Sequence, residues 1–196
     1  MKKLAKLVFS ASLFTCLLFL TSWADEGKPK FLKGIEFLGG FGHSNLEEQG
    51  DYDFIPLFVG FDFDLKPLIK KIGINYPGLV EFVEEPGFAL VIAPDSNVEI
   101  ANNFLFKIGI LPETSKFQPY FKGGAGMIYI TQHTREQGSQ FNFNQYAGAG
   151  FHYFFKKNMA FTAEYRYRHL SNADIDKPNS GINAHMGLIG ISYQFQ

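Results

Sequence analysis

The chain has 196 residues, with 18 basic and 19 acidic side chains, and its mean hydropathy is −0.05 although it contains 23 Phe and 9 Tyr. This length suits a single domain. The slightly acidic balance argues against nucleic acid as a partner, because proteins that bind phosphate backbones carry a basic surface.

The first 24 residues are typical of a secretory leader. Three lysines precede an apolar run over 7–20, and a small-x-small sequence ends at Ala24. The run is shorter than the ~20 apolar residues of a membrane-spanning helix. We therefore expect cleavage after Ala24 and one mature domain over 25–196. Cys16, the only cysteine, lies in the leader, so we expect neither a disulfide nor a cysteine-bound metal in the mature chain.

After the leader, apolar and polar residues alternate almost throughout, which is the period of β-strands. In the run FTAEYRYRH over 161–169, the odd positions are apolar or aromatic and the even positions are polar or charged. We predict eight strands, over 32–43, 53–64, 79–92, 101–111, 118–131, 142–155, 159–170 and 183–195.

One connection between predicted strands is long. Residues 65–78, with the sequence LKPLIKKIGINYPG, either form a short helix on the membrane surface or are a plain loop. In the first case Lys66, Lys70 and Lys71 would face anionic headgroups. The glycines of KGGAG and AGAG do not complete a phosphate-binding loop and indicate close strand packing instead.

Alternating strands suit either a soluble barrel or sandwich, with the apolar face inside, or an outer-membrane barrel, with the apolar face toward lipid. Strand length, aromatic strand ends and the charges of Glu164, Arg166 and Arg168 on the polar face favour the membrane barrel. The C-terminal GISYQF resembles the assembly signal of such barrels. We therefore predict an all-β, eight-stranded antiparallel up-and-down transmembrane β-barrel, with these three charges in an interior ion-pair network.

The segment RYRHLSNADIDKPNSGIN begins within the seventh predicted strand, which runs outward, and ends where the eighth begins. With an even number of strands both chain ends lie in the periplasm, so His169 is expected at the cell surface. Parity places His169, Ser171 and Asn183 on the lipid face, because strand residues two apart point the same way. The three side chains are thus expected to cluster at the level of the outer-leaflet headgroups.

Such a cluster permits acyl transfer. Serine becomes an effective nucleophile when an imidazole takes its proton and a third group orients that imidazole. His and Ser are also ordinary residues at a strand end, so the pair alone leaves both interpretations open. The adjacent His43 and Ser44 must face opposite ways and are interpreted as structural. His185 shares the face of Asn183 and is either an interfacial residue or a phosphate ligand. His133 and His152 show no ligand spacing with carboxylates, so we expect no metal site.

The residues HLSNADIDKPNSGIN resemble the His-x-Ser-Asn-Ala and Pro-Asn-x-Gly segment of the PagL family of lipid A 3-O-deacylases, which are eight-stranded outer-membrane barrels with a lipid-facing active site. The resemblance implies that His169 is the general base and that Ser171 attacks the ester at the 3-position of lipid A, releasing a 3-hydroxy fatty acid without a cofactor. It implies lipid A or lipopolysaccharide as the substrate and the outer membrane of a Gram-negative bacterium as the location. Whether the barrel forms a homodimer stays open.

The resemblance also assigns residues beyond this pair. Asn172 matches a family asparagine near the oxyanion, and Asn179 matches the asparagine of Pro-Asn. The chain departs from the family twice. Asn183 stands where the family's third catalytic residue is a glutamate, and Asp174 stands where a glycine amide is thought to help hold the oxyanion. The alternative interpretation is a non-catalytic outer-membrane barrel with a surface-binding or structural role.

Overall fold

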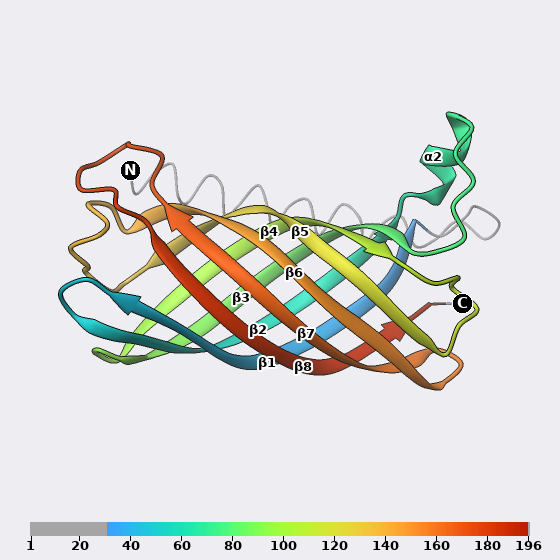
Figure 1. Cartoon of the computed structure of the whole chain (residues 1–196), viewed down its shortest axis with the longest axis horizontal. Coiled ribbons are helices and arrows are strands. Elements are labelled where there is room, and N and C mark those ends of the chain that lie inside the picture. Colours follow the sequence, from blue (N-terminus) through green and yellow to red (C-terminus); the bar gives the residue numbers. More distant parts are fainter. Residues whose placement is uncertain (1–30, 196) are drawn as a thin grey trace. The chain divides into compact units, whose positions relative to one another are not determined.

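The structure is a computed structural model that describes residues 31–195, so the expected leader over 1–24 and residues 25–30 lie outside it. Eight antiparallel strands pair in chain order, and the first pairs with the last to close a barrel, which confirms the predicted fold class (Figure 1). The strands are β1 (Leu32–Leu46), β2 (Gly50–Asp64), β3 (Val80–Ala93), β4 (Asn97–Gly109), β5 (Phe117–Ile130), β6 (Phe141–Lys156), β7 (Met159–Ser171) and β8 (Ile182–Gln194).

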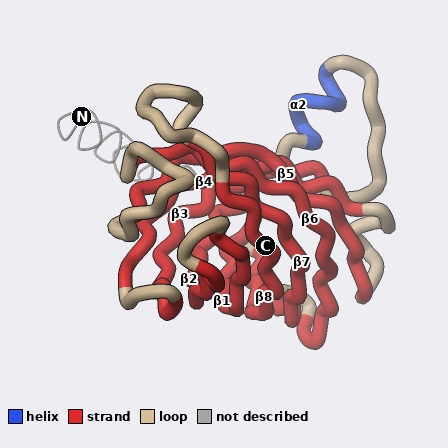
Figure 2. The backbone as a smooth tube through the Cα atoms, turned by 60° about the vertical axis from the view of Figure 1, so that its left-hand side comes forward, coloured by secondary structure: helices blue, strands red, loops and turns tan. Residues whose placement is uncertain are grey.

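The two ends of the barrel differ in their connections. One end, which we call the loop end, carries connections 47–49, 94–96, 131–140 and 172–181. The other, the terminal end, carries the start of β1, the end of β8 and the remaining connections. Between β2 and β3 the chain forms the short helix α2 (Lys66–Lys71), which stands away from the strands at the terminal end (Figures 1 and 2). The segment 65–78 therefore contains a short helix, while its contact with a membrane stays a prediction.

The outer wall of the barrel is apolar. Phe37, Phe106, Phe121 and Ile189 are each more than half exposed, and all lie on strands. A soluble barrel would bury such side chains inside, so the exposed wall agrees with the membrane barrel and contradicts the soluble alternative. Within the described range, no helix has the length and apolar character needed to cross a membrane.

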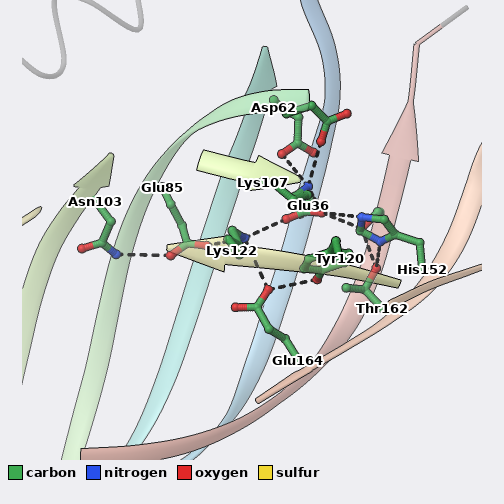
Figure 3. Close-up of polar contacts among 12 residues, drawn as sticks. Glu36, Asp62, Glu85, Asn103, Lys107, Tyr120, Lys122, His152, Thr162 and Glu164 are labelled. Atoms are coloured by element: carbon green, nitrogen blue, oxygen red, sulfur yellow. Dashed lines mark hydrogen bonds and ion pairs between the residues drawn. The ribbon is translucent and has the colours of Figure 1, made fainter. Parts of the chain in front are cut away.

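The interior holds a network of ion pairs (Figure 3) beside a cluster of buried apolar side chains that includes Phe54, Leu105 and Ile128. Lys107 Nζ donates to Glu36 Oε1 at 2.6 Å and to Asp62 Oδ1 at 2.9 Å, and Lys122 bridges Glu36 and Glu85. The predicted interior residues join this network, since Arg166 pairs with Glu85 and Glu164 and Arg168 pairs with Glu99. The expected ion-pair network is confirmed, and it occupies the space that a larger barrel would leave as a channel.

The glycine-rich runs of β5 and β6 lie where neighbouring strands approach closely. A Cβ at Gly124 would be 2.2 Å from the Phe104 carbonyl oxygen, and one at Gly148 would be 2.4 Å from the Tyr165 carbonyl oxygen. These distances are too short for any side chain, which agrees with the prediction of close strand packing.

Candidate active site

The pairing of β7 with β8 places His169 directly opposite Asn183. Alternation along both strands turns the two side chains to the outer wall, while their neighbours Arg168 and Ala184 are buried inside. The Nδ1 atom of His169 lies 2.7 Å from Oδ1 of Asn183. The pair that parity placed on one face is therefore in direct contact.

This hydrogen bond sets the tautomer of His169. An amide oxygen can only accept, so Nδ1 carries the proton and donates it to Asn183 Oδ1. The neutral imidazole then keeps its lone pair on Nε2. Tyr167, also on the outer wall, donates its hydroxyl to the same Oδ1 at 2.7 Å. Sequence reasoning did not single out Tyr167, although its position two residues before His169 was a usable signal.

Ser171 is the last residue of β7 and is half-buried opposite Phe143 of β6. It follows His169 by two strand positions, so the two side chains leave the same face about 7 Å apart along the strand. Among the described residues, His169 is bonded to Asn183, and no hydrogen bond joins it to Ser171. The strand brings the serine beside the histidine without closing the contact.

The connection 172–181 begins with a buried Asn172. Its backbone N–H donates to Asn179 Oδ1 at 2.8 Å, and its Nδ2 donates to the Asp176 carbonyl oxygen at 2.8 Å. Both amide side chains therefore hold the loop together. The side-chain amide of Asn172, expected near the oxyanion, is turned into the loop.

Asp174 occupies the position where the resemblance expects glycine. Its φ is +61°, and Ala173 before it has φ +54°. Aspartate tolerates this left-handed conformation better than most residues, which explains how it can replace a glycine here. Its Oδ1 accepts from Lys177 Nζ at 2.8 Å and from Asn179 Nδ2 at 3.1 Å. The Lys177 ammonium, with the Asn179 amide, holds the pKa of Asp174 below its usual value.

Gly181 closes the loop against the histidine. Its φ is +82°, and a Cβ there would lie 2.8 Å from His169 Cε1. Glycine is thus required both by the backbone and by the imidazole ring.

The connection 131–140, between β5 and β6, is hydrogen-bonded to the loop 172–181. Gly138 N–H donates to the Pro178 carbonyl oxygen at 2.7 Å, and Ser180 N–H donates to that of Glu136 at 2.9 Å. Gln137 and Asn179 form an antiparallel bridge between the same loops. Nothing in the sequence indicated that connection 131–140 would dock beside the candidate site, because this contact joins segments about forty residues apart.

The other histidines lie apart from this cluster or serve different contacts. His43 is exposed and donates from Nδ1 to Asp53 Oδ1 at 2.7 Å, while Ser44 is buried on the opposite face, as predicted. His152 is inside the barrel beside Thr162. His185 pairs with the Tyr165 hydroxyl at 2.6 Å. Among residues 31–195, no group of three or more His, Cys, Asp or Glu side chains is arranged to hold a metal ion.

Three solved structures with the same fold are distant from this chain in sequence. The crystal structure of the outer-membrane enzyme PagL is 17% identical with a TM-score of 0.58, and the match covers 83% of this chain and 99% of that one. Neisserial surface protein A is 13% identical with a TM-score of 0.57, covering 83% and 97%. OprG from Pseudomonas aeruginosa is 15% identical with a TM-score of 0.50, covering 84% and 96%. These matches agree with the eight-stranded barrel fold.

The family is shown by sequence. No curated protein matches the chain. A family model described as lipid A 3-O-deacylase (PagL) matches residues 73–192, which include β7, the loop 172–181 and most of β8. The match covers more than half of the chain. On this evidence the chain belongs to the PagL family of lipid A 3-O-deacylases.

Proposed function

We propose that this protein hydrolyses the ester-linked 3-hydroxyacyl chain at the 3-position of lipid A, using Ser171 and His169 on the lipid-facing wall of the barrel. The observation that carries the proposal is the hydrogen bond from His169 Nδ1 to Asn183 Oδ1 on the outer face, two positions from Ser171. This hydrogen bond leaves Nε2 of His169 without a proton, as a general base requires. Membership of the PagL family supports lipid A as the substrate.

The reaction would proceed by acyl transfer through serine. His169 Nε2 takes the hydroxyl proton of Ser171 as Oγ attacks the ester carbonyl carbon, forming a tetrahedral intermediate. The intermediate collapses with release of the sugar 3-hydroxyl, which receives the proton from the imidazolium. Water, deprotonated by the same imidazole, then cleaves the acyl-serine ester, and its proton passes back to Ser171 as the 3-hydroxy fatty acid leaves.

The negative oxygen of the tetrahedral intermediate needs hydrogen-bond donors that stabilise it. We assign the backbone N–H of Asp174 to this role, because it follows Ser171 in the left-handed turn and corresponds to the glycine amide of the family. The Asp174 carboxylate would oppose the oxyanion if it were free. Its bonds to Lys177 and Asn179 hold it within the loop and offset part of its charge. Asn172 and Asn179 act on this site by holding the loop in shape.

The loop end is proposed to face the cell surface. The start of β1 and the end of β8 lie together at the terminal end, as expected for a barrel whose chain ends are periplasmic. In this orientation the site opens to the outer leaflet, where lipid A resides. The lipid substrate of this site would reach Ser171 from within the bilayer, along the apolar outer wall.

The second candidate function is a non-catalytic barrel with a surface-binding or structural role. Two observations favour it. Among the described residues no hydrogen bond joins His169 to Ser171, and Asn183 carries no charge to stabilise an imidazolium. In apo structures catalytic hydrogen bonds are often open and close only around the substrate, so the first observation is compatible with an enzyme.

Mass spectrometry of lipid A from expressing cells distinguishes the two functions. We expect the wild type to remove one 3-hydroxyacyl chain and Ser171→Ala to remove none. Ser180→Ala is the matched control, because this serine lies exposed in the same loop and should leave deacylation unchanged. Heat-dependent gel migration verifies that each barrel is folded.

Unchanged lipid A with the folded wild type would favour the non-catalytic barrel. Deacylation by Ser171→Ala would contradict the serine mechanism.

A further inference from the structure

Asparagine in place of glutamate creates an orientation problem at Asn183. The two oxygens of a carboxylate are equivalent, so either one can accept the Nδ1 proton of a histidine. An amide presents an oxygen on one side and an NH₂ group on the other. The group that faces His169 therefore matters for asparagine and does not matter for glutamate.

The wrong orientation would disable His169 as a base. If Nδ2 of Asn183 faced the ring, it would donate to Nδ1, and the imidazole proton would move to Nε2. The Nε2 atom could then no longer accept the proton of Ser171. An asparagine can serve as the third member only while its oxygen is held toward His169.

Tyr167 makes the contact that favours the required orientation. Its hydroxyl donates to Asn183 Oδ1 at 2.7 Å, so this oxygen accepts two hydrogen bonds, from Tyr167 and from His169. A phenol is a better donor than acceptor, because its oxygen lone pair is delocalised into the ring. Tyr167 is thus better satisfied by the amide oxygen than by the NH₂ group.

The Tyr167 ring is itself held in place. It lies opposite His185 in the β7–β8 register, and the two rings pack edge to face with centroids 5.4 Å apart. This packing limits the rotation of Tyr167 and directs its hydroxyl toward Asn183.

We propose that Tyr167 is a positioning residue that keeps Asn183 Oδ1 toward His169 and so allows an asparagine to replace a glutamate as the third member of the site. This inference rests on the proposed function for its catalytic consequence. Its structural consequence, the tautomer of His169, can be measured separately.

Kinetics in two backgrounds provide the first test. In the wild type, Tyr167→Phe should lower kcat for lipid A about fivefold, the effect of losing one orienting hydrogen bond, with little change in KM. In an Asn183→Glu background the same substitution should change kcat by less than about twofold, because either carboxylate oxygen accepts. Tyr165→Phe is the control, because the Tyr165 hydroxyl bonds His185 and not Asn183.

The tautomer provides the second test, without need of turnover. The folded barrel in detergent micelles is labelled with ¹⁵N-histidine, and long-range ¹H–¹⁵N correlation spectra are recorded above the pH at which imidazoles protonate. His169→Gln identifies the signals of His169. We expect the Nδ1–H form in the wild type and in Tyr165→Phe, and a larger share of the Nε2–H form in Tyr167→Phe.

Three outcomes separate this inference from the proposed function. An unchanged tautomer in Tyr167→Phe would overturn the inference, and so would an equal loss of kcat in both backgrounds. A shifted tautomer in a barrel that leaves lipid A intact would support the role of Tyr167 and count against the deacylase.

Discussion

Backbone conformation restricts which residue types can stand around His169 as much as the chemistry of the site does. Gly181 lies in a turn with φ +82°, a conformation that favours glycine. The structure adds a reason that lies outside local sequence, because the imidazole of His169 fills the space that a side chain at 181 would occupy. Asp174, predicted as a weakness of the site, occupies a left-handed position and is bonded to Lys177 and Asn179.

Gly181→Ala should displace the His169 ring and lower deacylation about tenfold or more, because the added Cβ would lie 2.8 Å from Cε1 and φ would be strained. Gly187→Ala, on the strand β8 that follows this loop, is the control, since a Cβ there has no atom within 4 Å. Lipid A mass spectra at equal membrane abundance measure the effect. Equal activity of the two variants would contradict the packing of His169 against Gly181.

The loop 172–181 should loosen in acid through Asp174. Its folded pKa lies below its ordinary value near 3.8, so the charged form stabilises the loop above that pH. The contribution is lost as the pH falls through the folded pKa. Cleavage of this loop by an acid-active protease should therefore increase below about pH 4 in the wild type. Asparagine also tolerates the left-handed conformation at this position but has no carboxylate to titrate. Cleavage of the loop in Asp174→Asn should therefore show no such increase.

Among the elements, all eight predicted strands are present, and the differences lie at their ends. The structure extends β1 to Leu46 and begins β2 at Gly50, where the prediction had 43 and 53. Asn45 pairs with Asp51 in this extension. The hydrophobic alternation stops before the strands do, because residues beyond the membrane no longer need an apolar outer face while the backbone ladder still gains hydrogen bonds.

A helix was one of two alternatives predicted for residues 65–78, and α2 lies within them. Its residues are not buried, Lys70 and Lys71 lie in its last turn, and Ile72 just beyond it is 73% exposed. Exposed apolar and basic side chains side by side suit the surface of an anionic membrane better than water. This contact with lipid remains a prediction.

A tryptophan probe tests whether α2 touches lipid. The only tryptophan of the chain is Trp23, in the expected leader, so Ile72→Trp introduces a single reporter once that leader is removed. In vesicles with anionic lipids its emission should shift to the blue and be quenched by brominated acyl chains. Thr114→Trp, in the exposed turn 110–116 at the same end, should show neither effect. Identical spectra for the two variants would contradict membrane contact of α2.

At the scale of the whole molecule, the barrel differs from a soluble protein because it buries many charges beside its apolar cluster and exposes apolar side chains on its wall. Charged side chains such as Glu36, Lys107 and Arg166 are fully buried, and large apolar ones cover the outside. Most charges of the interior network have an opposite partner, so the ion pairs contribute to the stability of the barrel as a group. Removing one member exposes the others to uncompensated repulsion.

Lys107→Met should therefore destabilise the barrel by about 3 kcal/mol, because Glu36, Asp62 and Glu81 would lose the ammonium that they share. Lys156→Met, at the exposed end of β6, should change stability by less than about 0.5 kcal/mol. Urea unfolding in detergent micelles, followed by circular dichroism, measures both. A stability of Lys107→Met equal to that of the wild type would show that the network is dispensable.

The sequence alone determined the number of strands, the inside and outside of the wall, and the face shared by His169, Ser171 and Asn183. These properties follow from a period of two along the chain, which is a local property of strands. The sequence could not determine that His169 stands opposite Asn183 or that Tyr167 bonds the Asn183 Oδ1 atom. Nor could it determine that the Asn172 side chain turns into its loop. Those contacts depend on register between strands and on the docking of loops 131–140 and 172–181. Only the tertiary structure decided them, because they arise between residues that are distant in the chain and meet when the barrel closes.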